Sequence, residues 1–309
     1  MRPIIFLCSL AFSLLFSVQG QAQYRDITAQ DLESIQNYED TIALLSYAII
    51  NDSLAENRFG ATKKLIPTLV KALQVPNSYQ YPFSKVQSIS IQYPADSSFR
   101  IFTWQLYVDE NDYRYYGAIQ KNSETLELTP LIDRSGSIMR PEMEVLAGDR
   151  WFGALYYRIK QYTDAQGKTN YLLFGYDGYE FFNKRKLVEN LSFDETGKAV
   201  FGAPNFIENT PEGNKKTRNR LILDYSAEAS IRLNYDDIMG LIVFDHLIKM
   251  GLPGAGLTNV PDGSYDGYEL VDGIWTFKPK LFNQVSEEAP RPSPVLEDRG
   301  KKDIFGGKQ

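Results

Sequence analysis

Two hydrophobic patterns divide the chain, a helical one near the beginning and a strand-like one over most of the remainder. Between residues 28 and 74, apolar residues recur at helical spacing, including three leucines that are four residues apart. Thr28 is suited to cap a first helix, and Ser53 with Glu56 matches the capping box of another. Pro76 ends the pattern. We therefore expect two or three helices over this region.

From about residue 86 the hydrophobic period falls to two, which is typical of strands. In the segment FRIFTWQLYV, residues Phe102, Trp104, Leu106 and Val108 share the more apolar face. Similar runs follow as far as GIWTFKP, and turn signals separate them. Because no room is left for crossover helices, the sheet should be antiparallel. The pattern predicts an α+β fold, mainly antiparallel β in a large sandwich or curved sheet, with an N-terminal helical segment.

Both ends of the chain differ from the middle. Arg2 and the apolar run that follows it, with small residues at Gly20 and Ala22, are typical of a secretory signal peptide over residues 1–22. The tail SEEAPRPSPVLEDRGKKDIFGGKQ is rich in proline and charge and poor in apolar residues, which predicts disorder. We therefore expect an exported protein, periplasmic or secreted, with no membrane span after cleavage.

The domain organisation follows from these boundaries. We expect a signal peptide at 1–22, a helical segment at 23–80, an antiparallel β domain at 81–283 and a disordered tail at 284–309. Cleavage would remove Cys8, the one cysteine, so the remaining chain could form no disulfide and no thiolate metal site. An exported protein of this size without cysteine is typical of bacteria.

The charge balance argues against nucleic acid as a partner. Because Arg2 is the only charged residue before position 23, cleavage takes the net charge from −6 to −7. Binding to a duplex needs a concentrated basic face. The basic clusters at 184–186 and 215–220 are short and are read as solvated strand or loop positions. The 20 tyrosines and 18 phenylalanines suit a β-rich core and, as an alternative, a sugar-stacking surface.

The stretch VPDGSYDGYELVDGIW carries the clearest candidate metal site. Asp262, Ser264 and Asp266 are spaced like the first ligands of an EF-hand loop, which predicts a calcium site. The position that needs a bidentate glutamate is Gly273, so the match is incomplete. The alternative is that the three Asp-Gly pairs are turns, with Asp272-Gly273 closing a hairpin. The sequence leaves both interpretations open, so the expected cofactor is either calcium or none.

Candidates for catalysis are few. The only histidine is His246, and its neighbour Asp245 would point to the opposite face of a strand, so a structural role is expected. Pairs of carboxylates near strand ends are the remaining option, since glycoside hydrolysis uses two of them. The candidate acids are Asp177, Glu180, Asp224, Asp236, Asp237 and Asp245.

Several longer stretches carry a resemblance to a family. YLLFGYDGYEFFNKRKLVENLSF, AVFGAPNF, LILDYSAEASIRLNYDD, IVFDHL and PDGSYDGYELVDGIW, within residues 151–277, resemble an uncharacterised family of exported bacterial proteins. The resemblance implies export and assigns no activity or functional residue.

Two functional hypotheses follow. The first is an exported non-catalytic binding or structural protein of the bacterial cell envelope, with an envelope protein or a glycan as partner. The alternative is a carbohydrate-active hydrolase that uses paired carboxylates.

Overall fold

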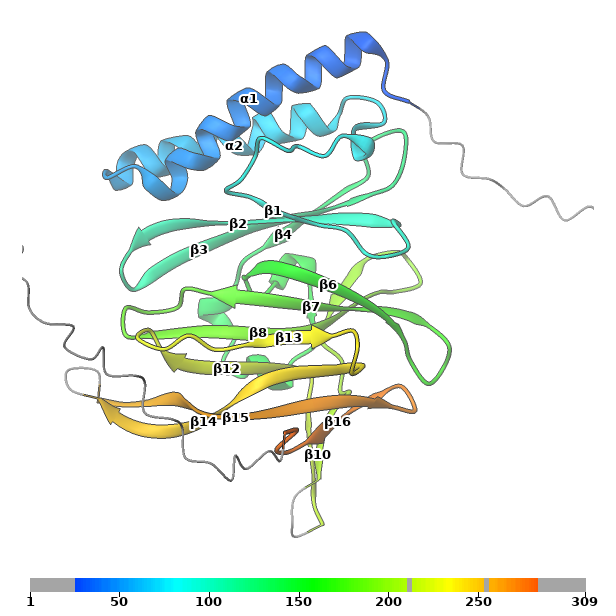
Figure 1. Ribbon diagram of the computed structural model, residues 1–309. Coiled ribbons are helices and arrows are strands. Elements are labelled where there is room, and N and C mark those ends of the chain that lie inside the picture. Colours follow the sequence, from blue (N-terminus) through cyan, green and yellow to red (C-terminus); the bar gives the residue numbers. More distant parts are fainter. Residues whose placement is uncertain (1–25, 210–212, 253–255, 283–309) are drawn as a thin grey trace, which may run out of the picture.

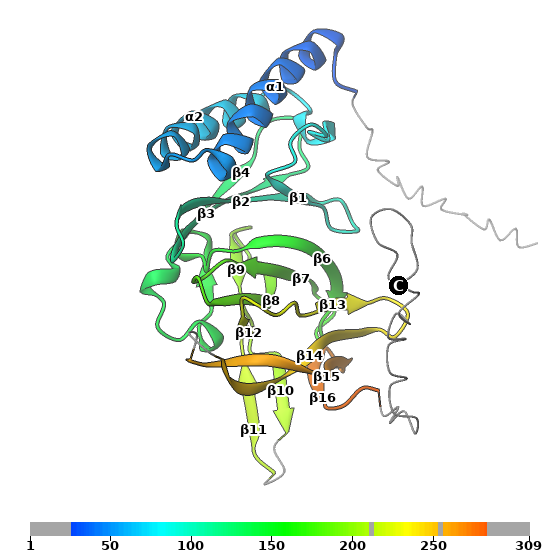
Figure 2. The ribbon, with the colours of Figure 1, turned by 60° about the vertical axis from the view of Figure 1, so that its left-hand side comes forward.

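The described residues stack in four layers. The computed structural model describes residues 26–209, 213–252 and 256–282. Two helices form the first layer, and three β-sheets follow beneath them (Figures 1 and 2). This arrangement confirms the predicted α+β class with mainly antiparallel sheets and N-terminal helices. The predicted signal peptide, 1–22, and the predicted tail, 284–309, lie outside the described residues.

The helical layer consists of α1 (Ala29–Asn51) and α2 (Ala55–Leu73), which pack against each other and on the first sheet. Thr28 caps α1 as predicted, since its hydroxyl accepts a hydrogen bond from the Asp31 N–H at 3.2 Å. In the described part of the chain, no helix combines the length and the apolar character that crossing a membrane requires.

The capping box predicted for the second helix is wrong. The N-cap position is Leu54, which makes no side-chain capping bond. The Asp52 carboxylate instead accepts the N–H of Leu54 at 2.9 Å. This bond holds the chain in a short turn between the helices, so Ser53 and Glu56 do not adopt the geometry of a capping box.

The first sheet has the strand order β1-β2-β3-β4. Its strands are β1 (Ser90–Gln92), β2 (Phe99–Asp109), β3 (Asp112–Lys121) and β4 (Leu128–Ile132). As predicted, Phe102, Trp104 and Leu106 share a buried face, and this face packs on the helices. The other face is buried too, because Phe99 and Ile101 pack against the next sheet. The helix η1 (Ser78–Gln80) lies in the segment that leads into this sheet.

The middle sheet is covered on both faces. Its order is β5-β9-β8-β7-β6, and β12 pairs with β8 as well. The strands are β5 (Leu146–Ala147), β6 (Leu155–Thr163), β7 (Thr169–Asp177), β8 (Asn183–Phe193), β9 (Ala199–Phe201) and β12 (Arg220–Ser226). Leu173 and Leu187 pack toward the first sheet, whereas Leu172 and Val188 pack toward the third. Short helices η2 (Ser135–Ser137), η3 (Pro141–Met143) and η4 (Gly148–Arg150) lie between β4 and β6.

The third sheet closes the stack, with the order β11-β10-β16-β15-β14-β13. The strands are β10 (Phe206–Asn209), β11 (Lys215–Arg218), β13 (Leu233–Asp236), β14 (Leu241–Leu252), β15 (Gly256–Val271) and β16 (Ile274–Lys278). Their pairs are antiparallel except for β10 with β16, which run parallel. Trp275 and Tyr268 bury their rings against the middle sheet.

The Asp-Gly pairs have two different roles. Asp272-Gly273 is the tight turn between β15 and β16, as predicted, with φ of 49° and 78° at the two residues. Asp262-Gly263 and Asp266-Gly267 lie within β15 rather than in a loop, and of the two only Asp262-Gly263 has turn features, with a φ of 90° at Gly263. Between the pairs Asp245↔Tyr265 and Leu247↔Pro261 the register shifts, so the extra residues of β15 bulge there.

Candidate functional site

Three charged residues form a row across the middle sheet at the end of β7. Asp177 lies opposite Arg185 of β8, and Arg185 lies opposite Asp224 of β12. Directly opposite residues on paired strands share a face, so the register alone brings the three side chains together. The Arg185 Nε donates to the Asp224 carboxylate, and Nη1 lies 3.9 Å from Asp177 Oδ2. The row therefore places one cation between two carboxylates.

Asp177 organises the turn that follows β7. Its Oδ1 accepts hydrogen bonds from the Tyr115 hydroxyl and from the Tyr179 N–H, both at 2.9 Å. The same Tyr115 oxygen accepts the N–H of Gly178 at 2.7 Å. Asp177 is only 5% exposed, and this burial raises the pKa of its carboxyl group. The loop is therefore fixed to β3 by a buried carboxylate.

The β7–β8 loop is held further by two cations. The Arg185 guanidinium lies over the ring of Tyr179, 3.2 Å from the centroid, and Tyr179 takes the left-handed φ of 49°. Lys184 Nζ donates to the carbonyls of Gly178 at 2.9 Å and Glu180 at 2.5 Å. Burial lowers the pKa of Lys184. These contacts fix the loop to β8, and the loop forms a wall between two cavities.

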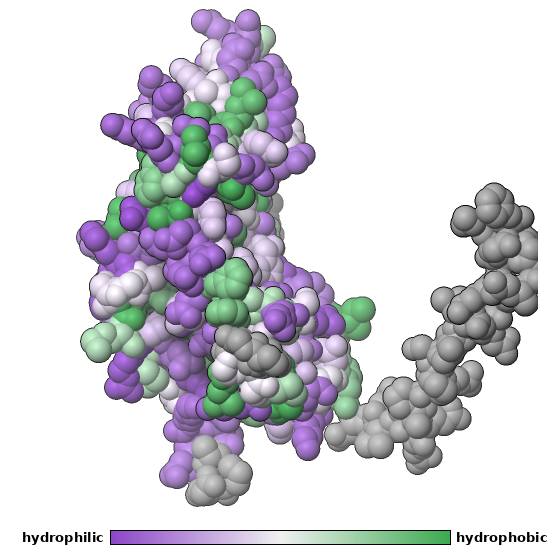
Figure 3. Space-filling model, turned by 90° about the vertical axis from the view of Figure 1, so that its left-hand side faces the viewer, coloured by the Kyte–Doolittle hydropathy of each residue, from purple (hydrophilic) through white to green (hydrophobic). Residues whose placement is uncertain are grey.

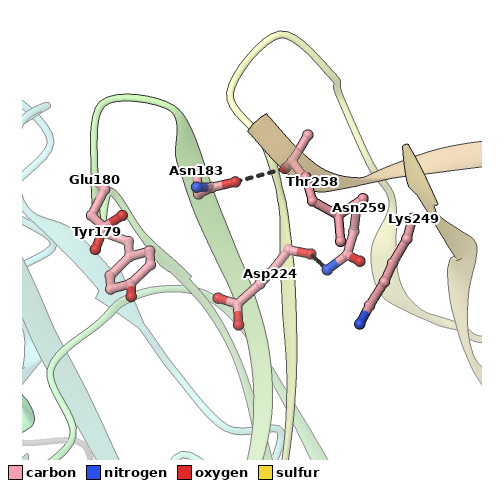
Figure 4. A pocket seen from close by; sticks show the side chains of 8 residues that line it. Tyr179, Glu180, Asn183, Asp224, Lys249, Thr258 and Asn259 are labelled. Atoms are coloured by element: carbon pink, nitrogen blue, oxygen red, sulfur yellow. Dashed lines mark hydrogen bonds between the residues drawn. The ribbon is translucent and has the colours of Figure 1, made fainter. Parts of the chain in front are cut away.

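Two cavities meet at this wall and share Tyr179 and Glu180. The first, of about 270 Å³, lies between the loop, β12 and the β14–β15 hairpin (Figure 4). The second, of about 350 Å³, lies toward β3 and contains Asp177 and Arg185. Together they form what we call the polar cleft. Figure 3 views the molecule from this side, where hydrophilic side chains predominate.

The first cavity is lined by side chains from four strands. Thr258 Oγ1 donates to Asn183 Oδ1 at 2.7 Å, and Asn259 Nδ2 donates to the Asp224 carbonyl at 2.9 Å. Among the described residues, Asn183 Nδ2 and Lys249 Nζ make no hydrogen bond. The cavity thus offers a ligand both donors and acceptors.

The six carboxylates predicted as candidates separate into two groups. Asp177, Glu180 and Asp224 line the polar cleft. The remaining three line neither cavity and serve local structure. Asp236 accepts two N–H groups of its own turn, Asp237 pairs with Arg158 and Lys160, and Asp245 accepts the N–H of Arg232.

The predicted calcium ligands lie on β15 rather than in a loop. Asp262 Oδ1 accepts the N–H and the hydroxyl of Ser264, at 2.9 and 2.7 Å. Asp266 Oδ2 lies 2.7 Å from His246 Nδ1, and its Oδ1 accepts the Lys280 N–H at 3.0 Å. Within the described residues, no three His, Cys, Asp or Glu side chains group closely enough to hold a metal ion. Calcium binding here stays a prediction.

His246 is held by a carboxylate. It sits at the register shift of β14, and its partner is Asp266, not the adjacent Asp245. The expectation that Asp245 does not orient this imidazole is therefore confirmed, while the partner across the strand pair was not foreseen.

Arg185, Tyr179 and Lys249 are among the cleft residues that the sequence does not indicate, and Asn183, Thr258 and Asn259 are others. In the sequence, Arg185 stands in a short basic cluster that predicts a solvated strand or loop position. Its neighbours Asp177 and Asp224 are 8 and 39 positions away in the sequence, so the row becomes visible only with the strand register.

Comparison with known proteins adds no family to this description. No protein-family model, curated protein or solved structure matches the chain. The resemblance to exported bacterial proteins therefore stays a prediction.

Proposed function

We propose that the protein is an exported, non-catalytic binding protein of the bacterial cell envelope, and that the polar cleft binds a glycan. The observation that carries the proposal is the lining of the first cavity. Lys249 and Asn183 present donors, Asp224 and Glu180 present acceptors, and Tyr179 adds an aromatic ring. Sugar hydroxyls both donate and accept hydrogen bonds, so a cavity that offers both kinds of partner suits them.

The charges favour binding over hydrolysis. A glycosidase needs one carboxyl group that gives up a proton and a second that acts as base or nucleophile. Asp224 is bonded to Arg185, and the Oδ1 of Asp177 is occupied by two donors. Both carboxylates are thus engaged by donors of the protein itself, which favours binding over hydrolysis.

Glycan binding is tested with an array of bacterial envelope and environmental polysaccharides, followed by calorimetry on the ligands found. Asp224→Asn and Lys249→Met should each weaken binding at least tenfold, because each removes a charged hydrogen-bonding group from the cavity. Asp237→Asn is the matched control, since Asp237 also pairs with an arginine but lies outside the cleft. Equal affinity in all three variants, or no ligand on the array, would contradict the proposal.

A carbohydrate-active hydrolase is the second candidate. It is favoured by one observation, the raised pKa of Asp177 in the second cavity, which is the property of a general acid. A reducing-end assay on the bound polysaccharides distinguishes the two functions. Release that is lost in Asp177→Asn would establish the hydrolase, whereas binding without release supports the first proposal.

Calcium binding by Asp262, Ser264 and Asp266 is proposed separately from the cleft. Its test is the melting temperature in millimolar Ca²⁺ and in EDTA, for the wild type and Asp262→Asn. At a hundredfold excess over the dissociation constant, bound calcium stabilises by about 2.7 kcal/mol. A calcium-dependent rise that the variant lacks would support the site, and identical curves would remove it.

A further inference from the structure

A third cavity lies at the tip of the β7–β8 loop, next to the polar cleft. It has a volume of about 310 Å³ and is lined by Phe181, Phe182, Ser226, Ala227 and Glu228. We call it the aromatic cavity. The same loop contributes residues 179 and 180 to the polar cleft, so one loop borders all three cavities.

The two phenylalanines form an exposed aromatic patch. Phe181 is 51% and Phe182 46% exposed, and their rings meet edge to face with 4.9 Å between centroids. A single exposed apolar side chain is common on proteins, whereas an apolar patch is typical of a binding surface. The patch therefore indicates a ligand that carries an apolar group.

Hydrogen bonds fix the backbone that carries this patch. The Phe181 N–H donates to Asn111 Oδ1 at 3.1 Å, and the Phe182 carbonyl accepts the Ala227 N–H at 2.8 Å. The loop is thus bonded to the β2–β3 turn on one side and to the end of β12 on the other. Because the backbone is positioned before a ligand arrives, less ordering is required on binding.

Strand register places the aromatic cavity beside the first cavity of the polar cleft. Ser226, which lines the aromatic cavity, is paired with Asn183, which lines the first cavity. Asp224 of the first cavity lies two positions before Ser226 on β12, which is about 7 Å along a strand. Figure 4 shows Asn183 directed toward Thr258 in the first cavity. Two linked sugar rings therefore suffice to occupy both cavities.

Polar groups near the patch match an acetamido substituent. Asn183 Nδ2 and the Glu228 carboxylate make no hydrogen bond among the described residues, so they offer a donor and an acceptor. An acetamido group has a carbonyl that accepts, an N–H that donates and a methyl group that suits an aromatic ring. A hydroxyl group at the same carbon would supply no apolar atom for the patch.

We propose that the glycan of the polar cleft is an oligosaccharide of N-acetylated amino sugars, and that the aromatic cavity binds one of its acetamido groups. One ring occupies the first cavity, and the next ring places its acetamido methyl on the patch of Phe181 and Phe182. The acetamido carbonyl accepts from Asn183 Nδ2, and the acetamido N–H donates to Glu228. This inference rests on the proposed glycan binding and names the class of sugar.

The probes are N-acetylglucosamine and its β-1,4-linked oligomers up to the hexamer, titrated calorimetrically into the purified protein. Cello-oligosaccharides of the same lengths are the matched series, because they share the linkage and carry a hydroxyl group in place of the acetamido group. The N-acetylated trimer should bind at least tenfold more tightly than the cello-trimer, through one methyl contact and two hydrogen bonds. Its affinity should also exceed that of the monomer at least tenfold, since the monomer fills one cavity.

Variants separate the aromatic cavity from the polar cleft. Phe182→Ala should weaken the N-acetylated trimer about tenfold and bring its affinity close to that of the cello-trimer. Lys249→Met alters the first cavity and should weaken both trimers by the same factor, so their ratio stays unchanged. Ile238→Ala is the control, because Ile238 is 98% exposed in the turn between β13 and β14, outside the three cavities. All three side chains lie at the surface, so melting temperatures should stay within about 3 °C of the wild type.

Saturation-transfer NMR provides a readout besides affinity. Irradiation of the aromatic protons should reach the acetamido methyl protons of the bound trimer most strongly, because that methyl lies on the patch. The transfer should fall sharply in the double variant Phe181→Ala with Phe182→Ala. Stronger transfer to the ring protons of the sugar than to the methyl group would contradict the assigned position.

The outcomes distinguish this inference from the proposed function. If other glycans bind in the polar cleft, but the N-acetylated series binds no better than the cello series, this inference is overturned and the proposed function stands. If no glycan binds, both are overturned. An unchanged ratio of the two trimers in a folded Phe182→Ala protein would also overturn the assignment of the aromatic cavity.

Discussion

Arg100 and Arg220 are both completely buried, yet the first sheet and the middle sheet accommodate them by different means. Arg220 of β12 lies directly opposite Glu189 of β8. Its Nε donates to the Glu189 carboxylate at 2.6 Å, and that carboxylate also accepts the Tyr156 hydroxyl at 2.5 Å. The charge in the middle sheet is therefore neutralised by its cross-strand partner.

Arg100 of β2 has no carboxylate partner among the described residues. Its guanidinium donates to the carbonyls of Ser78 and Tyr81 at 2.9 and 2.6 Å, to the Tyr93 hydroxyl at 2.9 Å and to Gln120 Oε1 at 2.8 Å. Burial lowers the pKa of this arginine. Most of these acceptors lie in the irregular segment between α2 and β2, so the side chain tethers that segment to the sheet.

The difference shows that a buried arginine can serve two structural purposes. In the middle sheet it joins two strands through an ion pair, and removing one member leaves the other as an isolated buried charge. In the first sheet it satisfies neutral oxygens, and removing it leaves acceptors without donors, which costs less. The following substitutions rank these effects.

The largest loss is expected from Arg220→Met. It leaves the Glu189 carboxylate buried without a cation and should lower the free energy of unfolding by about 3–5 kcal/mol. Denaturant unfolding measures the loss. The double variant Arg220→Met with Glu189→Leu should recover much of the lost stability, because it removes both charges. If Arg220→Met alone lost less than about 1 kcal/mol, the proposed difference between Arg220 and Arg100 would be refuted.

A smaller loss, of about 2–3 kcal/mol, is expected from Arg100→Met, because several neutral oxygens lose their donor while no charge is left behind. Limited proteolysis should cut residues 78–93 faster than in the wild type. Arg114→Met is the control, since Arg114 is exposed and its loss should stay within about 0.5 kcal/mol. A loss equal to that of Arg220→Met would show that the type of acceptor does not matter.

Asp177 provides an intermediate case, because its side chain is buried whereas that of its partner Arg185 is partly exposed. Burial raises the pKa of the Asp177 carboxyl group, so the folded state binds the proton more tightly than the unfolded state does. Protonation of Asp177 therefore stabilises the fold at low pH. This stabilisation is lost as pH rises from about 4 through the raised pKa. The unfolding free energy of the wild type relative to Asp177→Asn should therefore fall between pH 4 and 7. A difference that is constant with pH would refute the shift.

The smallest effect is expected at Asp224, which pairs with Arg185 but has a side chain that is 48% exposed. Solvent screens such a pair, so Asp224→Asn should cost about 0–1 kcal/mol of stability. Thermal unfolding in low and high salt measures it. A loss comparable to that of Arg220→Met would mean that burial does not govern the strength of these pairs.

The sequence predicts the helices, strands and turns of this fold better than it predicts which charged residues are buried. The helical leucines, the apolar face of β2 and the Asp272-Gly273 turn all follow from local pattern and were confirmed. The Asp-Gly pairs of β15 favour turns, whereas the register shift that accommodates them in a strand depends on β14. Its long pairing with β14 on one side outweighs these local preferences.

The candidate site was predictable only in part. Asp177, Glu180 and Asp224 were recognised as acids near strand ends, and the structure brings them to one cleft. Arg185 between them was missed, as were Arg100 and Arg220 in the interior, because arginine in a single sequence is read as a surface residue. Their positions depend on strand register and layer order, which local patterns do not contain.

The parallel pair of β10 and β16 sets the order in which the molecule can be completed. Phe206 pairs with Trp275, so β10 and β11 reach the third sheet only through a strand that is synthesised some 70 residues later. Until β16 has left the ribosome, β10 and β11 are a lone hairpin, and a lone hairpin is marginal in water. The third sheet therefore cannot be completed until nearly all of the described chain has been made.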